Sequence, residues 1–230
     1  MNLVTVIETL KTFKPISIFL YGSQATNTQN KNSDYEIGVV FKDDEYVARS
    51  EIKEKIPNKK FSIFPFKLGN LQNHSIDTPF QKEIYILSLI SGNAYTIFGE
   101  KIIENLTKPK TTNHHLLMDS SFDLGTALSA VMAFKNKNVK LANELMYKSL
   151  FYATRNLIYF KTKKLIVGYN NIYKEAKVLN LPEEYNQLLT AGYELRNGIR
   201  KKIDKNLYFQ NISYINKFII PTIEKSTKNN

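Results

Sequence analysis

Two short apolar runs separated by a polar stretch constrain the fold of this chain most strongly. The first run, Ile16–Tyr21, is rich in β-branched and aromatic residues and ends at Gly22, which is typical of a buried strand that enters a turn. The second run, Ser33–Phe41, has the same character and predicts a second strand. The start of the chain is therefore expected to form a pair of strands whose polar residues gather at the strand ends.

Two acidic residues, Asp34 and Glu36, lie at the start of the second predicted strand. Successive side chains of a strand point to opposite faces, so these two share one face, with Cα atoms about 6.6 Å apart. Two neighbouring carboxylates repel each other unless a cation or a proton lies between them. Hard divalent cations such as Mg²⁺ accept oxygen ligands of this kind and keep positions for substrate phosphates. Asp34 and Glu36 are thus the predicted metal ligands and catalytic residues.

Gly22 and Ser23 follow the first predicted strand and supply the complementary half of such a site. A glycine lets backbone amides approach a phosphate, and Ser23 is expected to cap the following helix while its N–H faces an anion. Enzymes that transfer phosphoryl or nucleotidyl groups use a phosphate-binding turn together with carboxylates that bind a metal ion. The alternative is a surface turn and a half-exposed strand with two solvated acids.

The pattern Gly22-Ser23, a spacer of ten residues and Asp34-x-Glu36 resembles the signature of the polymerase-β-like nucleotidyltransferases. It is most similar to the kanamycin-nucleotidyltransferase type and to the minimal nucleotidyltransferase domains. The resemblance implies that Ser23 contacts a nucleoside triphosphate (ATP or another NTP) and that Asp34 and Glu36 bind Mg²⁺ or Mn²⁺. It further implies transfer of an NMP, such as AMP from ATP, to a hydroxyl acceptor on a small molecule or a protein, and it makes a homodimer plausible.

One feature departs from this family pattern. A third carboxylate usually lies on a later strand of the family's domain, where it often serves as the base for the acceptor hydroxyl. The aligned position here is Ser62, and no acid occurs from Lys55 to Ile76. The nearest later acids are Asp77 and Glu83, and Glu83 suits the first turn of a helix, where a carboxylate favours the dipole. The alternative function is therefore a degenerate member that binds a nucleotide or a partner without transfer.

The rest of the chain predicts an α+β protein, with strands followed by helices. Three further elements are expected before the polar segment Lys108–Asn113: a strand at Phe61–Lys67, a helix that starts at Thr78-Pro79, and a strand at Ala94–Phe98. Beyond it the periodicity is helical and favours an up-and-down bundle. We expect a mixed-sheet nucleotidyltransferase domain over residues 1–110, an all-α helical bundle over 111–225 and a disordered tail over 226–230.

The predicted bundle resembles the C-terminal domain of kanamycin nucleotidyltransferase and the HEPN bundles. HEPN ribonucleases carry an arginine followed four to six residues later by a histidine. Arg196-Asn197 has the start of that pattern, but no histidine follows it. Without an imidazole the acid–base step of RNA cleavage has no evident agent, so ribonuclease activity is not expected.

Charge and composition limit the classes of partner. The net charge is +11, and it is uneven: 14 basic and 12 acidic residues in 1–110 against 18 and 9 in 111–230. A basic second half suits an anionic partner, but lysines spread over solvated faces explain it equally well, so nucleic acid is not the favoured ligand. The absence of cysteine fits a reducing cytoplasm, and no apolar run is long enough for a membrane span.

Overall fold

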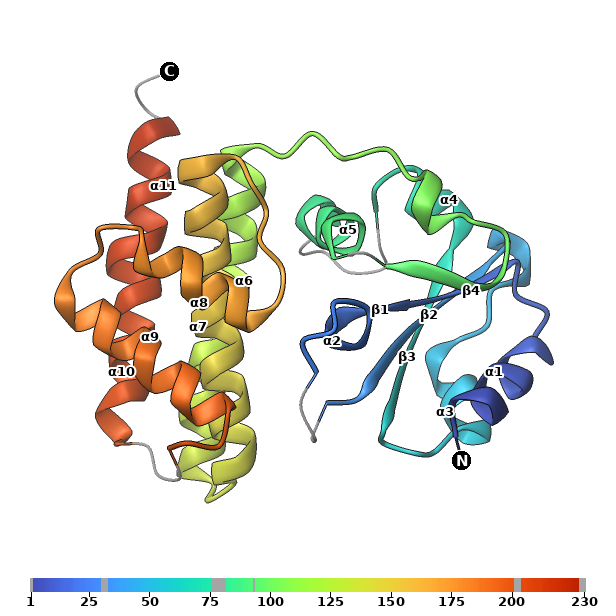
Figure 1. The fold of residues 1–230 in the computed structure, drawn as a ribbon, viewed down its shortest axis with the longest axis horizontal. Helices are drawn as coiled ribbons and strands as arrows, with labels where there is room; N and C mark the ends of the chain where they lie inside the picture. Colours follow the sequence, from blue (N-terminus) through green and yellow to red (C-terminus); the bar gives the residue numbers. More distant parts are fainter. Residues whose placement is uncertain (1, 30–32, 76–81, 93, 201–203, 228–230) are drawn as a thin grey trace. The chain divides into compact units, whose positions relative to one another are not determined.

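The chain forms two compact units, Met1–Lys110 and Thr111–Asn230. The computed structural model describes residues 2–29, 33–75, 82–92, 94–200 and 204–227 (Figure 1). The first unit is built on a four-stranded sheet and the second is helical, so the expected α+β class is confirmed. Within the described residues, no helix has both the length and the apolar character needed to cross a membrane.

The sheet of the first unit is mixed. Its strands lie in the order β3-β2-β1-β4, and their bounds are Ser17–Tyr21 (β1), Tyr35–Phe41 (β2), Phe61–Lys67 (β3) and Tyr95–Gly99 (β4). Strand β1 pairs antiparallel with both β2 and β4, whereas β2 and β3 run parallel. The parallel pair requires a crossover between its strands, which contains helix α3, Arg49–Lys55. Pro65 lies on the edge strand β3, as its missing N–H demands.

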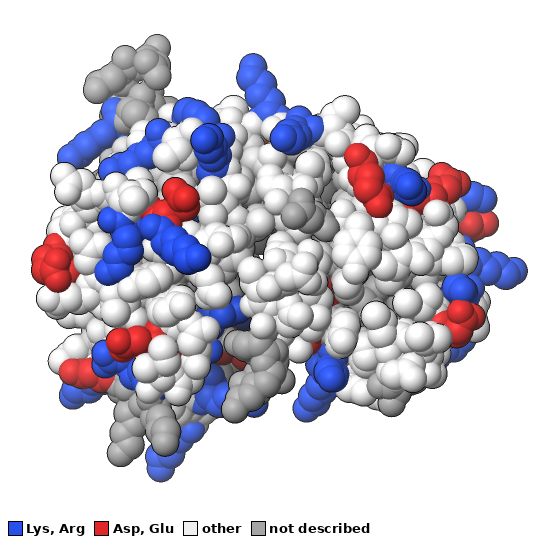
Figure 2. Space-filling view, viewed as in Figure 1, with Lys and Arg blue, Asp and Glu red and all other residues white. Residues whose placement is uncertain are grey.

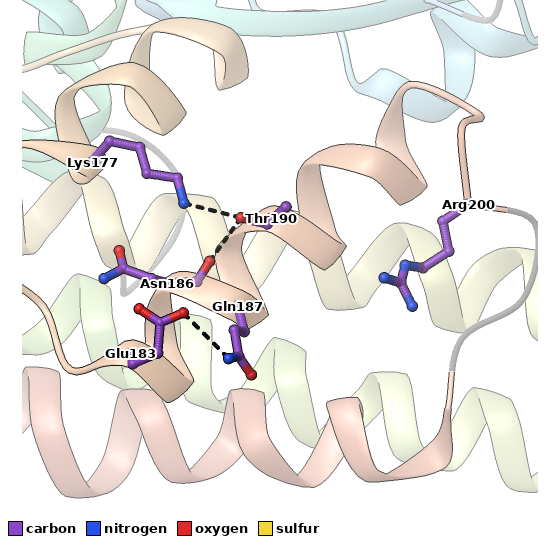
Figure 3. A pocket seen from close by; sticks show the side chains of 6 residues that line it. All are labelled: Lys177, Glu183, Asn186, Gln187, Thr190 and Arg200. Atoms are coloured by element: carbon purple, nitrogen blue, oxygen red, sulfur yellow. Dashed lines mark hydrogen bonds between the residues drawn. The ribbon is translucent and has the colours of Figure 1, made fainter.

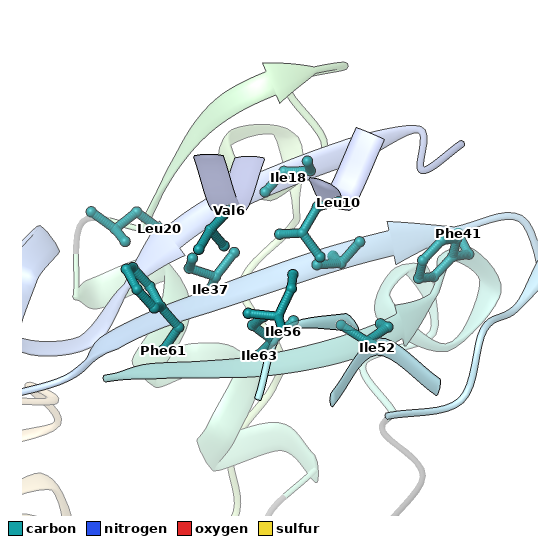
Figure 4. Close-up of a cluster of buried hydrophobic side chains, with 11 residues drawn as sticks. Val6, Leu10, Ile18, Leu20, Ile37, Phe41, Ile52, Ile56, Phe61 and Ile63 are labelled. Atoms are coloured by element: carbon teal, nitrogen blue, oxygen red, sulfur yellow. The ribbon is translucent and has the colours of Figure 1, made fainter. Parts of the chain in front are cut away.

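One face of the sheet packs against helices α1 (Leu3–Lys11) and α3 (Figure 1). Asn2 caps α1 by accepting a hydrogen bond from the Thr5 N–H. The contacts are made by apolar side chains that alternate along the strands, together with those at helical spacing on α1 and α3. Figure 4 shows this cluster: Val6, Leu10, Ile18, Leu20, Ile37, Val39, Phe41, Ile52, Ile56, Phe61 and Ile63.

The opposite face of the sheet packs against a second set of short elements. These are helix α5 (Lys82–Ser91), helix α4 (Leu68–Gln72) and the 3₁₀ turn η2 (Ile103–Asn105), and another 3₁₀ turn, η1 (Asp43–Glu45), follows β2. The buried cluster on this face consists of Phe19, Tyr21, Val40, Phe66, Leu71, Ile86, Leu89, Ala94 and Ile103. The helix start expected at Thr78-Pro79 lies outside the described residues.

The second unit is a helical bundle built on a long hairpin. The helices are α6 (Asn113–Lys135), α7 (Val139–Thr162), α8 (Tyr169–Lys177), α9 (Glu183–Arg196), α10 (Lys205–Ser213) and α11 (Ile220–Thr227). Helices α6 and α7 pack along each other across a short link, and Asn138 caps α7 by accepting from the Leu141 N–H. Helices α10 and α11 lie against α6, while α8 and α9 lie against α7.

The last helix continues past Pro221, a residue type that normally ends a helix. A π-helical turn, Tyr214–Ile219, follows α10, and α11 then continues through Pro221 to Thr227. Proline lacks an N–H, and its ring clashes with the carbonyl four residues earlier. A wider π turn just before the proline relieves that conflict, so the helix continues. It also extends two residues into the segment expected to be disordered.

Gly38 provides a test of packing inside the sheet. A Cβ added there would lie 2.0 Å from the Phe19 ring, which is fully buried. Gly38→Ala is expected to lower the free energy of unfolding by about 1–3 kcal/mol. Phe19→Leu should remove part of the clash, so chemical denaturation of the double variant should reveal a favourable coupling of at least about 0.5 kcal/mol. Strictly additive losses would contradict the contact.

Candidate functional site

Three side chains form a row across one end of the sheet, where β1 ends and where β2 and β3 begin. Tyr21 of β1 pairs with Glu36 of β2, and Glu36 pairs with Ser62 of β3. Residues paired in register point to the same face, which here is the α5 side because Tyr21 belongs to that cluster. Asp34 directly precedes β2 and accepts a hydrogen bond from the Ser62 hydroxyl. The structure therefore brings both predicted acids to the same serine.

Gly22 lies against the carboxylate of Glu36. Its φ of +70° favours glycine, and a Cβ added there would be 1.6 Å from Oε2 of Glu36. Any other residue at position 22 would displace the carboxylate or the turn. Three of the four predicted site residues, Gly22, Asp34 and Glu36, are thus held together by the β1–β2 pairing and by Ser62.

Ser23 lies next to this glycine, but it does not cap the helix as expected. Helix α2, Gly22–Ala25, begins one residue earlier, and its N-cap residue Tyr21 makes no side-chain cap hydrogen bond. The reason is that the turn at Gly22 already directs the chain into the helix, so Ser23 falls within its first turn. The half-buried Ser23 remains adjacent to Gly22 in sequence.

The register also shows which residue occupies the position where the family pattern has a third carboxylate. Ser62 is the residue of β3 beside Glu36, while Phe64 and Phe66 lie beside Gly38 and Val40 farther along. Among the described residues, no group of three or more His, Cys, Asp or Glu side chains is placed to hold a metal ion. Two carboxylates with a neighbouring hydroxyl fit one hard cation whose remaining ligands are phosphates and water. These three side chains alone do not supply a complete set of ligands for a cation.

Tyr21 adds a hydroxyl that stays protonated. Its side chain is buried, and it accepts a hydrogen bond from the Tyr85 hydroxyl of α5 at 3.2 Å. Burial raises the pKa of Tyr21 well above its ordinary value, and the nearby Tyr85 and Glu36 add to the increase, while Arg49 opposes it. Tyr21 can therefore orient a group by hydrogen bonding, but it is no general base near neutral pH.

Arg49 is a member of this neighbourhood that the sequence did not reveal. Its Nε donates to the Ile63 carbonyl at 2.9 Å, and its guanidinium lies 3.9 Å from the centre of the Phe64 ring. The Phe64 ring is in turn 6.2 Å from that of Tyr21. A fixed positive charge thus lies at the edge of β3, close enough to Tyr21 to affect its pKa. Only the parallel crossover brings α3 to that edge, so no local sequence signal marks Arg49.

A second group of polar side chains is buried between α6 and α7. Arg155 forms an ion pair with Asp119 at 2.8 Å, and the Asn156 amide donates to Asp119 at 2.8 Å and to Asp123 at 3.5 Å. Burial, and then the charge of Asp119, raise the pKa of Asp123 well above its ordinary value, while Arg155 opposes the shift. Burial therefore favours the neutral form of Asp123.

This buried group was not predicted from the sequence. The Arg-Asn pair considered there was Arg196-Asn197, but Arg196 lies over the Tyr169 ring at 4.4 Å. The buried Arg-Asn pair is Arg155-Asn156, within the apolar middle of α7. The available signal was an Arg-Asn pair flanked by apolar residues on both sides along the helix.

A shallow pocket of about 460 Å³ lies in the second unit. Figure 3 shows its lining: Lys177, Glu183, Asn186, Gln187, Thr190 and Arg200. Lys177 donates to Thr190 at 3.0 Å, Gln187 donates to Glu183 at 3.2 Å, and Arg200 forms an ion pair with Glu194. Because these polar groups already pair with one another, the row on the sheet is the better candidate site.

Comparisons with known proteins bear on the fold and on the family of the first unit. Residues 5–90 match the family model described as polymerase beta, nucleotidyltransferase. The fold is similar to that of spectinomycin adenyltransferase AAD(9) from Enterococcus faecialis, solved with ATP and spectinomycin. That similarity has a TM-score of 0.61 and 14% identity, and it covers 95% of this chain and 99% of the other, so it establishes a shared fold alone. A comparison with curated proteins gave no match.

The raised pKa of Asp123 predicts that replacing its carboxyl group by an amide stabilises the folded protein in a pH-dependent way. Between the unfolded pKa of about 3.9 and the raised folded pKa, only the unfolded state releases the proton, so Asp123 lowers stability as pH rises. Asp123→Asn should therefore stabilise the protein at pH 7, and the gain should shrink as the pH falls toward the unfolded pKa. Denaturant titrations across this range measure it.

The matched variant is Asp119→Asn, which removes the carboxylate paired with Arg155. Breaking a buried ion pair leaves the other charge without compensation, so this variant should lose about 3–5 kcal/mol at pH 7. If both asparagine variants changed stability in the same direction, the proposed contrast between Asp119, which pairs with Arg155, and Asp123, which burial destabilises, would be wrong.

Proposed function

We propose that this chain, in which residues 5–90 match the polymerase beta, nucleotidyltransferase family model, transfers a nucleoside monophosphate to a hydroxyl group. The observation that carries the proposal is the packing of the Glu36 carboxylate on Gly22, with Asp34 held beside it through Ser62. A turn that only glycine can form next to two carboxylates suits a phosphate chain and the cation that accompanies it.

Each residue has a role in this proposal. Asp34 and Glu36 hold Mg²⁺ or Mn²⁺, and Gly22 and Ser23 bind the triphosphate. When bound, the metal ion neutralises charge on the phosphates and orients them. Arg49 places a further positive charge near the row, where it favours an anionic substrate.

The reaction is an in-line displacement. A lone pair of the acceptor hydroxyl forms a bond to the α-phosphorus, the bond to the bridging oxygen breaks, and pyrophosphate leaves with that electron pair. The hydroxyl proton must pass to a base, and Ser62 cannot take it because a serine hydroxyl is not basic near neutral pH. In this proposal the proton passes to a carboxylate of the row, that of Asp34 or of Glu36.

The substrates are proposed from the fold relative, whose structure contains ATP and spectinomycin. ATP is the proposed donor, and a small hydroxylated molecule is the proposed acceptor; a protein side chain is the second choice. The proposal places the protein in the cytoplasm and includes a dimer of two copies. Nucleic acid is not the favoured partner, because lysines spread over solvated faces explain the basic second half equally well.

The second candidate function is nucleotide binding without transfer. Ser62 favours it, because this hydroxyl stands where the family pattern has a third carboxylate. The two candidates share Mg²⁺-dependent nucleotide binding and differ in turnover. Release of pyrophosphate in the presence of a hydroxylated acceptor would separate them.

The first experiment is calorimetric titration of ATP, with and without Mg²⁺, into the wild type and an Asp34→Asn/Glu36→Gln variant. The amides keep the shape of the carboxylates but remove their charge, so Mg²⁺-dependent affinity should fall at least about tenfold, or about 1.4 kcal/mol. Asp44→Asn, an exposed acid of the same unit, is the matched control and should bind as the wild type does. Equal Mg²⁺-dependent binding by both proteins would refute the metal site.

Ser62→Asp tests the geometry of the row. An acid beside Glu36 should complete a three-carboxylate site and strengthen Mn²⁺ binding to the free protein by about tenfold or more, as electron paramagnetic resonance can measure. Ser62→Ala is the control and should give no increase. If Ser62→Asp bound Mn²⁺ no better than the alanine variant, the row would not be a cation site.

A further inference from the structure

Arg49 reaches around the edge of the sheet to the face that carries the row. Its helix, α3, packs on the other face through Ile52 and Ile56. The Arg49 side chain extends past the edge strand β3, where its Nε donates to the Ile63 carbonyl at 2.9 Å. Its guanidinium then lies 3.9 Å from the centre of the Phe64 ring, which packs with the cluster on the α5 face. A helix on one side of the sheet thus places its charge on the other side.

The guanidinium of Arg49 retains hydrogen-bond donors beyond those that the fold uses. Within the described residues Arg49 forms no ion pair, and its hydrogen bond to the Ile63 carbonyl uses only Nε. The nearby acid of the same helix, Glu51, accepts from the Ala48 N–H instead. Arginine has five N–H donors in a planar fork and keeps its charge at physiological pH. The terminal nitrogens of Arg49 therefore suit an oxyanion from outside the chain.

The position of Arg49 relative to the row indicates which substrate it meets. Phe64 lies two residues along β3 from Ser62, so their side chains share a face. The proposed triphosphate site at Gly22 follows β1, on the other side of Glu36. In an in-line displacement the acceptor hydroxyl lies opposite the leaving pyrophosphate. A triphosphate at the β1 side therefore places the acceptor toward β3, beside Arg49.

The acceptor side of the row is less acidic than the family pattern predicts. Ser62 is neutral where that pattern has a third carboxylate, and Arg49 adds a positive charge. A cationic acceptor would be repelled there, whereas an anionic one is attracted. The whole chain has a net charge of +11, and Figure 2 shows Lys and Arg side chains at many places on one face of the molecule. Local and overall charge both favour an anion.

We infer that the acceptor is a small hydroxylated molecule that also carries a phosphate or carboxylate group, and that Arg49 binds this group. The inference rests on the proposed function and names its substrate class. The guanidinium fork matches two oxygens of either group, and the Phe64 ring supports its flat face. The oxyanion and the reacting hydroxyl are separate parts of the acceptor, so the bonds that form and break are those of the proposed transfer.

Titration with inorganic phosphate, followed by nuclear magnetic resonance, tests the oxyanion site without turnover. The probe is added to metal-free protein, and the Arg49 Nε–H signal, which the hydrogen bond to Ile63 protects from exchange, is recorded. A saturable shift of this signal is expected. Sodium chloride at the same ionic strength is the control and should produce no such shift. The absence of a saturable phosphate response at Arg49 would overturn the inference.

A matched pair of variants separates a specific site from a general effect of charge. Arg49→Gln removes one positive charge, and so does Lys55→Gln at the other end of α3, where the Lys55 ammonium lies 4.5 Å from the centre of the Phe13 ring. Phosphate affinity, measured on the backbone amide signals of Ile63 and Phe64, should fall at least about tenfold in Arg49→Gln only. Equal losses in both variants would overturn the inference.

Arg49→Lys provides the conservative variant. It keeps the charge but loses the planar fork, so it should retain an affinity for phosphate between those of the wild type and Arg49→Gln. Thermal unfolding of the three proteins shows whether the substitutions leave the fold intact. A lysine variant as weak as the glutamine variant, at unchanged stability, would still support recognition by the fork, whereas a lysine or glutamine variant that binds as the wild type does would overturn it.

The donor is the other source of an oxyanion near Arg49. Calorimetric titration of Mg²⁺ and ATP into Arg49→Gln distinguishes it from the acceptor. A loss of ATP affinity as large as that in Asp34→Asn/Glu36→Gln would assign Arg49 to the triphosphate and overturn the inference. A loss confined to phosphate binding, with a much smaller change for ATP, supports an acceptor site.

Pyrophosphate release tests the substrate class with three sugars that differ in one substituent: glucose, glucose 6-phosphate and glucosamine. The phosphorylated sugar should give the highest kcat/KM, and Arg49→Gln should lower that value about tenfold more than the value for glucose. A preference for glucosamine would overturn the inference. The phosphate titration decides it if none of the three sugars is an acceptor, because it needs no turnover.

The inference and the proposed function can fail separately. A phosphate response at Arg49 without any Mg²⁺-dependent binding of ATP would refute the proposed transfer, and the acceptor assignment with it, but would leave an oxyanion site. Mg²⁺-dependent binding of ATP without a phosphate response at Arg49 would refute the oxyanion site and leave the proposed transfer intact.

Discussion

The contact between the Glu36 carboxylate and the backbone of Gly22 is the constraint around which the first unit is arranged. It requires β1 to end opposite the second residue of β2, and it requires a residue without a side chain at that end. A shift of one residue in this pairing would turn Glu36 toward the α1 and α3 helices and into an apolar core. Fold and candidate site are thus fixed by the same register.

The sequence predicted the elements of the fold well, because each carries a local signal. The apolar runs at Ile16–Tyr21 and Phe61–Lys67 became β1 and β3, and the helical periodicity after His114 became the bundle. Turn and helix-end details were less predictable. Ser23 was expected to cap a helix that in fact starts at Gly22. The last helix continues past Pro221 because a π turn precedes the proline, and no local pattern indicated that turn.

The parts of the site that could not be predicted depend on contacts between distant segments. Gly22, Asp34 and Glu36 could be named from their spacing, but Arg49 reaches the site only because β2 and β3 run parallel, with α3 in the crossover. The buried pair Asp119 and Arg155 needs two helices to be packed in one register. Sequence alignment with the family pattern identified Ser62 as the position of the third carboxylate. Its hydrogen bond to Asp34 could not be predicted, because it depends on the pairing of β2 with β3.

The central position of β1 has a consequence for how the first unit is made. Its partner on one side, β2, follows closely in the chain, but its partner on the other side, β4, is synthesised only after three further helices and a strand. Until then one edge of β1 offers unpaired backbone groups beside the apolar Ile18 and Leu20, a surface on which another chain could add a strand. The nascent chain therefore passes through a vulnerable interval that ends when Tyr95–Gly99 emerges and closes the sheet.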